Sequence, residues 1–185
     1  MSVDELEILP GVPAGLAALK RVGLVLVVVT NQPDVARGAL ARTVADDINA
    51  ALRLRLPDID GLRACFHDDS DSCLCRKPKP GMLLDAAAAH ALRLERSYMI
   101  GDSWKDTAAG QAAGCVTVQL RSEEIRPNGA NEPALWVDTF GQAVDWILTI
   151  ERQRVSGRII RQAALTADQA LPHSHDGSSI EQGLA

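Results

Sequence analysis

The chain has 185 residues, which is enough for one compact domain with an extension. Its 46% hydrophobic and 23% charged residues are ordinary for a globular protein and argue against wholesale disorder. A net charge of −5 gives no positive field for nucleic acid or anionic lipid, so any phosphate that the protein handles must be held locally, as in a small substrate.

The amino-terminal segment shows no export signal, because Asp4, Glu5 and Glu7 stand where such a signal needs basic residues. The longest apolar run, VGLVLVVV at 22–29, is far shorter than the ~20 residues that span a bilayer. These features predict a cytoplasmic protein without a membrane span. In that reducing compartment, clustered cysteines are more often metal ligands or catalytic groups than disulfides.

Helices and strands alternate from the start of the chain. Pro13–Arg21 is expected to be a helix that a proline opens, and Leu24–Thr30 is apolar throughout, as in a parallel strand buried on both faces. Thr43–Leu56 is predicted as a second helix. Gly61–His67 is a weaker strand that runs into a cysteine-rich loop.

The same alternation continues to about residue 150, with the following predicted elements: a helix at Pro80–Leu94, a strand at Arg96–Asp102, a helix at Thr107–Ala113, a strand at Cys115–Leu120 and a closing helix at Gln142–Ile150. This pattern predicts an α/β fold, a doubly wound open parallel sheet with helices on both faces. We therefore expect a domain over 1–150. We expect 151–185 to be a polar, poorly ordered tail, in which Ile159–Leu171 is an alternative short amphipathic helix for a partner.

Polar side chains follow several of the predicted strands. Ligands of doubly wound folds bind beyond the carboxyl ends of the strands, where this chain has Thr30 and Asn31, then Lys77, then Asp102 with Asp106 four residues on. Thr30 and Asn31 could contact phosphoryl oxygens, Lys77 could neutralise their charge, and Asp102 is a suitable Mg²⁺ ligand. Each residue alone also has an ordinary explanation as turn, cap or solvated charge. Their shared position at strand ends favours a phosphate site.

Three segments resemble the haloacid dehalogenase superfamily: VVVTNQPDVARG (27–38), CFHDDSDSCLCRKPKPGM (65–82) and SYMIGDSWKDTAAGQAAGC (97–115). Within it they are similar to the zinc-containing branch of the heptose bisphosphate and histidinol-phosphate phosphatases, over about Ile8–Ile150. The resemblance implies a haloacid dehalogenase-type fold without a large cap domain. It also implies catalytic roles for Thr30 and Lys77 and a Mg²⁺ ligand at Asp102.

The same resemblance extends to the neighbours of these residues. It implies that Arg76 contacts substrate phosphate beside Lys77, that Asn31 belongs to the same catalytic and substrate-binding group, and that Asp106 is the further acidic position near Mg²⁺.

The cysteine-rich loop pairs Cys65-x-His67 with Cys73-x-Cys75. Three thiolates and one imidazole make a closed tetrahedral set, which is typical of structural zinc. Zinc would pin a loop with few apolar side chains and so hold the residues that follow it. The alternative is a disulfide with one spare thiol.

Other residues near the loop are given simpler roles. We expect the three aspartates of the loop to be solvated, and Cys115, which starts an apolar strand, to lie in the core. The aspartates are Asp68, Asp69 and Asp71.

The family's nucleophile is the difficulty. Members transfer phosphate to the first aspartate of an Asp-x-Asp-Gly motif that ends their first strand, and the second aspartate is the general acid and base. The few residues before Ile8 contain no such strand, so both aspartates are absent. Asp58 to Gly61 spells the motif, but it lies between a helix and a strand, at the edge of the sheet opposite Thr30, so we interpret Asp58 and Asp60 as turn residues.

Two functions of different class follow. The first is Mg²⁺-dependent hydrolysis of a small phosphorylated sugar or amino alcohol, with the first strand lost to a late start codon or a fragmentary gene. KPKPGM favours a heptose bisphosphate substrate over histidinol phosphate. The second is a catalytically inactive, zinc-stabilised binding or assembly domain. A missing central strand also predicts uncovered sheet edges, through which, or through the tail, the chain could associate. No nucleic-acid or membrane partner is expected.

Overall fold

The computed structural model describes the backbone of residues 2–169 and the side chains of residues 2–157. The chain divides into two compact units, Met1–Leu148 and Thr149–Ala185. The elements in chain order are η1 (Val3–Glu5), α1 (Val12–Arg21), β1 (Val27–Asn31), α2 (Arg42–Arg55), β2 (Gly61–Cys65), η2 (Asp69–Asp71), α3 (Gly81–His90), η3 (Leu94–Arg96), β3 (Tyr98–Gly101), α4 (Trp104–Ala112), β4 (Val116–Leu120), β5 (Leu135–Val137) and α5 (Phe140–Gln169). Among these residues, no helix has the length and apolar character needed to cross a membrane.

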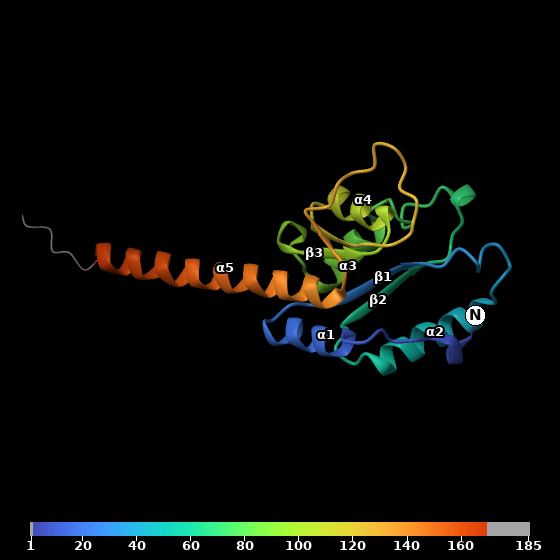
Figure 1. Ribbon diagram of the computed structural model, residues 1–185, viewed down its shortest axis with the longest axis horizontal. Helices are drawn as coiled ribbons and strands as arrows, with labels where there is room; N and C mark the ends of the chain where they lie inside the picture. Colours follow the sequence, from blue (N-terminus) through green and yellow to red (C-terminus); the bar gives the residue numbers. More distant parts are fainter. Residues whose placement is uncertain (1, 170–185) are drawn as a thin grey trace, which may run out of the picture. The chain divides into compact units, whose positions relative to one another are not determined.

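Every strand pairing that the structure describes is parallel, which confirms the predicted α/β class. The strands form two sheets, β1–β2 and β3–β4–β5, where the sequence predicted one. Figure 1 shows α1 and α2 running along one side of β1 and β2, and α4 against β3. Within the described part of the chain, β1 and β3 are each an edge strand of their sheet. They do not pair with each other, so each has one uncovered edge, as expected.

A shared core joins the two sheets within the first unit. Leu19 of α1 and Ile147 of α5 are almost fully buried, and the side chains of Leu26, just before β1, and of Ile100 in β3 pack against them. Tyr98 of β3 adds an edge-to-face contact with Trp146. Burying these apolar side chains is worth about 1.5–3 kcal/mol each, so apolar packing holds the sheets together where no backbone ladder does.

Helix α4 begins three residues before the expected Thr107. Ser103 caps its amino end by accepting a hydrogen bond from the backbone N–H of Lys105, and Asp106 accepts one from the N–H of Ser103 in return. This reciprocal pairing is the capping box, which satisfies two helix donors that would otherwise lack partners. It places Asp102 immediately before a fixed helix start.

Helix α5 is longer than the predicted Gln142–Ile150. It continues to Gln169 because 151–169 contains mainly residues that tolerate a helix, no proline, and one glycine, Gly157. The backbone over this stretch is therefore helical where we expected a poorly ordered tail, and the alternative of a short helix at Ile159–Leu171 coincides with the longer helix as far as Gln169. The rest of the predicted tail, 170–185, lies outside the described residues.

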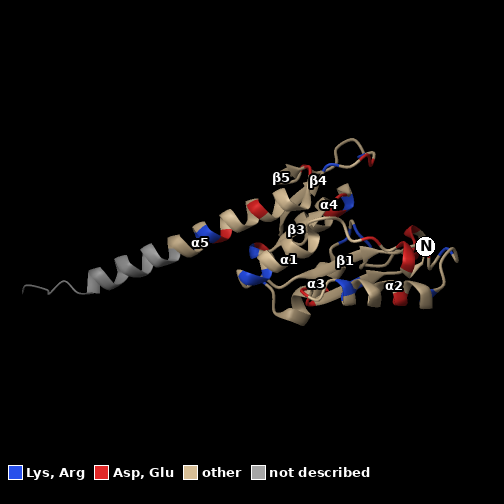
Figure 2. Ribbon diagram, turned by 60° about the horizontal axis from the view of Figure 1, so that its bottom comes forward, with Lys and Arg blue, Asp and Glu red and all other residues tan. Residues whose placement is uncertain are grey.

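Charged residues of both signs are mixed along the described ribbon (Figure 2). Short ion pairs such as Arg42 with Asp46 in α2, four residues apart, account for part of this mixing.

Candidate active site and metal centre

The predicted phosphate-site residues lie at or after the carboxyl ends of strands. Thr30 and Asn31 end β1, and Asn31 lies in register with Cys65, the last residue of β2. Asp102 follows β3 directly. Lys77, in the loop after β2, reaches across to α4 and links the two sheets at this end.

Lys77 has two fixed partners. Its Nζ lies 2.6 Å from Oδ1 of Asp106 and donates a 2.8 Å hydrogen bond to the carbonyl oxygen of Val29 in β1. Asp106 is buried and Lys77 is largely so, with side chains 8% and 12% exposed. The ammonium group is thus held at the junction of β1 and α4.

The contact with Val29 lies on the free edge of β1. The carbonyl of Leu26 and the N–H of Gln32 both form hydrogen bonds on the β2 side. The backbone N–H and C=O groups of successive residues point alternately to the two edges of a strand, so the carbonyl of Val29 points to the edge away from β2. A lysine amine therefore satisfies a carbonyl that no strand in the described part of the chain pairs with.

Asn31 fixes the backbone of Lys77. Its Nδ2 donates to the carbonyl oxygen of Lys77, and its Oδ1 accepts from the Lys77 N–H, both at 3.0 Å. The side-chain amide is thereby used on the protein itself, which gives Asn31 an orienting role. Thr30 beside it is partly buried, and its hydroxyl has no hydrogen-bond partner among the described residues, so it can donate to a ligand.

The two aspartates after β3 differ in their surroundings. Asp102 is exposed and its carboxylate has no partner in the described part of the chain, whereas Asp106 is 5% exposed and is bound by Lys77 and by the N–H of Ser103. A free carboxylate at a strand end suits Mg²⁺, which prefers hard oxygen ligands. Asp102 can therefore hold the metal, and Asp106 is placed to hold Lys77.

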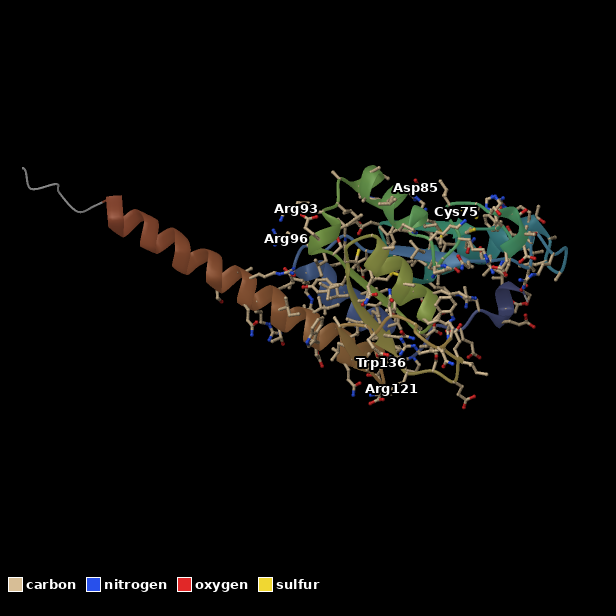
Figure 3. The ribbon with its side chains drawn as sticks, turned by 90° about the horizontal axis from the view of Figure 1, so that it is seen from above. Cys75, Asp85, Arg93, Arg96, Arg121 and Trp136 are labelled. Carbon is tan, nitrogen blue, oxygen red and sulfur yellow. The ribbon has the colours of Figure 1, made fainter. Side chains whose placement is uncertain are left out.

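The four expected zinc ligands gather at one point. The ligand atoms of Cys65, His67, Cys73 and Cys75 all lie within 4.8 Å of one another. The sulfur of Cys75 is 3.3 Å from that of Cys65 and 3.4 Å from that of Cys73, and Nδ1 of His67 is 3.2 Å from Cys75. Figure 3 shows Cys75 in the loop between β2 and α3.

These separations fit a metal and exclude a disulfide in this structure. Ligands about 2.3 Å from a tetrahedral zinc ion lie roughly 3.5–3.8 Å apart, whereas a disulfide needs about 2.05 Å. All four cysteines of the chain are free thiols. Cys115 is 8% exposed, as expected of a core residue.

The electrostatics of the thiols also favour a cation. Burial and the neighbouring sulfurs of Cys65 and Cys73 raise the pKa of Cys75 to about 12. Burial opposes ionisation of Cys73, but the backbone N–H of Arg76 and the adjacent thiols lower its pKa overall. A bound Zn²⁺ would supply the positive charge that lets all three thiols ionise.

The expectation that the three loop aspartates are solvated is confirmed for Asp69 and Asp71, which are exposed, whereas Asp68 is partly buried. Arg37, from the turn after β1, pairs with Asp68 at 2.7 Å, and Arg76 donates from Nε to Asp69 at 2.8 Å. Arg37 holds the pKa of Asp68 down to about 2. No pattern in the sequence indicated Arg37, because its contact with Asp68 depends on how two separate loops meet.

The first residue of α3, Gly81, lies too close to the zinc loop to carry a side chain. Its N–H bonds to the carbonyl oxygen of Leu74, and a Cβ at this position would lie 2.3 Å from that oxygen. Only glycine lets the helix begin directly against the zinc loop.

The Asp58–Gly61 segment lies away from the site. Asp60 accepts hydrogen bonds from Lys20 and from the N–H of Leu26, before the start of β1, whereas Thr30 lies at the far end of that strand. This position agrees with a turn role.

Comparison with known proteins gives consistent matches. The HAD-hydrolase-like family model matches residues 74–143. The chain is 35% identical over 159 residues to D-glycero-beta-D-manno-heptose-1,7-bisphosphate 7-phosphatase of Escherichia coli K12, covering 79% of this chain and 78% of that protein. The Helicobacter pylori J99 protein of the same name is 31% identical over 151 residues, covering 78% of this chain and 84% of that protein.

A solved structure resembles the fold. The D,D-heptose 1,7-bisphosphate phosphatase of B. bronchiseptica, in complex with magnesium and phosphate, superposes with a TM-score of 0.72 at 28% identity, covering 80% of this chain and 87% of that chain.

Proposed function

We propose that this chain, which belongs to the heptose bisphosphate phosphatase branch of the haloacid dehalogenase superfamily, provides the Mg²⁺ and phosphate site for hydrolysis of a sugar phosphate, D-glycero-D-manno-heptose 1,7-bisphosphate. The observation that carries this proposal is that Lys77 bonds both to Val29, beside Thr30 in β1, and to Asp106, in the helix that follows Asp102. The magnesium and phosphate in the B. bronchiseptica relative support it.

Each residue has a distinct chemical role in the proposal. Asp102 would hold Mg²⁺, which would supply positive charge to the phosphoryl oxygens. Thr30 donates its free hydroxyl to a phosphoryl oxygen, and Lys77, held by Asp106, neutralises charge that develops during transfer. Arg76, next to Lys77 in the chain, contacts a phosphate of the substrate. Asn31 keeps the Lys77 backbone in place.

The nucleophile is not among the described residues of the site. Asp106, which pairs with Lys77, and Asp102, which follows β3, are both assigned other roles. The edges of β1 and β3, joined at their carboxyl ends through Lys77, are where a further parallel strand would bring an aspartate to the phosphate. We propose that catalysis requires such a strand, ending in the Asp-x-Asp motif that the family resemblance implies.

Phosphate release tests this function. The chain would be assayed with Mg²⁺ and heptose 1,7-bisphosphate, alone and extended upstream in frame to include the Asp-x-Asp strand. Activity confined to the extended form, and abolished by Asp102→Asn, is expected. No activity in either form, with zinc bound and a cooperative unfolding transition, would favour the alternative of an inactive, zinc-stabilised binding domain.

A parallel assay with histidinol phosphate tests the second candidate substrate. The Lys-Pro-Lys-Pro-Gly-Met stretch and the named relatives favour the heptose compound. A higher kcat/KM for histidinol phosphate would reverse that assignment.

A further inference from the structure

The guanidinium group of Arg76 is held from one side by the zinc loop. Its side chain is only 9% exposed, yet Nε donates to Oδ1 of Asp69 at 2.8 Å and Nη1 donates to the carbonyl oxygen of His67 at 3.3 Å. Nη2 has no hydrogen-bond partner among the described residues and is not one of the fully buried atoms lacking one. The Nε edge is therefore used internally, and the outer edge keeps donors for an anion.

Asp69 is the residue that makes this arrangement specific. Its side chain is 75% exposed, so it does not serve core packing. It lies between two guanidinium groups, with Oδ1 2.8 Å from Nε of Arg76 and Oδ2 3.6 Å from Nη2 of Arg37. A carboxylate on Nε fixes the plane of the guanidinium, because the five N–H groups of arginine form a rigid fork.

Arg37 extends the same network to the turn after β1. It contacts Asp68 through both Nε, at 3.0 Å, and Nη2, at 2.7 Å. The residues that follow Thr30 in the chain are thus tied to the loop that carries Arg76. Arg76 is thus bonded directly to Asp69 and linked to Asp68 through Arg37.

The side chains of Arg76 and Lys77 diverge although the residues are adjacent. Lys77 points towards Val29 and Asp106, while Arg76 points into the zinc loop towards His67 and Asp69. The two cations therefore address different parts of a bound substrate, and each is held by its own aspartate.

Resting on the proposed function, we propose that Asp69 is a positioning residue that presets the Arg76 guanidinium for a substrate phosphate, with Arg37 holding the Asp68–Asp69 pair in place. The expected effect falls on binding, because Asp69 does not contact the reacting atoms. Loss of one charge-assisted bond to an oriented guanidinium corresponds to a change in KM of about tenfold.

Two substitutions separate positioning from simple charge balance. Asp69→Ala removes the acceptor, whereas Asp69→Asn removes the charge but keeps an oxygen that can accept from Nε. In whichever form hydrolyses heptose 1,7-bisphosphate in the assay above, we expect Asp69→Ala to raise KM about tenfold with kcat within about twofold, and Asp69→Asn to restore KM to within about threefold of the unaltered protein.

Asp47→Ala is the matched control, because Asp47 is exposed on α2 and loses the same charge. It should leave KM unchanged, and zinc content should stay at one ion per chain in all variants. An unchanged or lower KM in Asp69→Ala would overturn the proposal, since Asp69 would then merely compete with phosphate for Arg76.

A second readout does not require turnover, so it can test the role of Asp69 even if the proposed phosphatase function is wrong. The Nε–H of Arg76 should give a slowly exchanging NMR signal in the unaltered chain and in Asp69→Asn, and fast exchange in Asp69→Ala. Absence of hydrolysis with this pattern intact would reject the phosphatase assignment alone. An Nε–H signal that is the same in all three proteins would reject the role of Asp69.

Discussion

Removal of the Lys77 ammonium should lower the free energy of unfolding, because it leaves the buried Asp106 carboxylate without its cation. In Lys77→Met, Asp106 would keep its capping bond to Ser103 but lose the cation 2.6 Å from Oδ1, with its own side chain only 8% exposed. The carbonyl of Val29 would lose its donor as well. We expect urea unfolding to show a loss of about 3–5 kcal/mol, the usual cost of leaving one buried charge without its partner.

The size of this effect follows from the geometry. At an effective dielectric constant of about 20, two unit charges at this distance attract by about 6 kcal/mol, most of which is offset by the cost of removing both groups from water. A double-mutant cycle of Lys77→Met and Asp106→Asn isolates the pair, because asparagine can still accept from the Ser103 N–H. We expect a coupling energy of about 2 kcal/mol or more.

The exposed pair of Lys20 and Asp60 is the matched control. It has a similar separation of 2.7 Å but side chains 34% and 29% exposed, so its coupling energy should stay below about 1 kcal/mol. Equal coupling energies for the two pairs would refute the argument that Lys77 and Asp106 form a desolvated, preset unit.

Three further predictions concern the zinc loop and pH. Cys73→Ser should reduce zinc from one ion per chain to a trace, measured by atomic absorption, and lower Tm by at least about 5 °C, because the loop then loses its metal; retained zinc would contradict the ligand set. Gly81→Ala should cost about 1–3 kcal/mol in urea unfolding, since its Cβ would meet the carbonyl oxygen of Leu74; an unchanged midpoint would show that the loop can shift. The Lys20 ammonium and the Leu26 N–H lower the pKa of Asp60, so this carboxylate stabilises the fold at neutral pH by about 1 kcal/mol and loses that effect as pH falls below its usual 3.8. The difference in unfolding free energy between the unaltered chain and Asp60→Asn should therefore vanish in acid, and a difference that persists there would contradict the assignment.

Much of the fold could be predicted because its signals are local. The β-branched run that ends at Thr30 has the composition of a buried parallel strand, and the structure has β1 there. Strand β5 could not be found in the same way, because three residues, Leu135–Val137, are too short to show a periodic pattern. The start of α4 was readable in principle, since Ser103 and Asp106 have the spacing of a capping box.

The site was predictable where chemistry follows strand ends and unpredictable where it depends on contacts between loops. Spacing alone indicated the four candidate zinc ligands, which the structure gathers. No pattern in the sequence shows that Asn31 clamps the Lys77 backbone or that Arg37 reaches Asp68, because these contacts arise from the folded positions of separate segments. The split of the sheet between β1 and β3 likewise depends on tertiary pairing.

The measurement that tests the account most directly is calorimetric titration of inorganic phosphate into the zinc-loaded chain, with and without Mg²⁺. It examines the strand-end site without requiring a nucleophile. We predict phosphate binding that depends on Mg²⁺ and that Asp102→Asn abolishes, while the zinc content and the unfolding midpoint stay unchanged. Phosphate binding that is the same in Asp102→Asn, or that ignores Mg²⁺, would contradict the claim that these strand ends form a magnesium-dependent phosphate site.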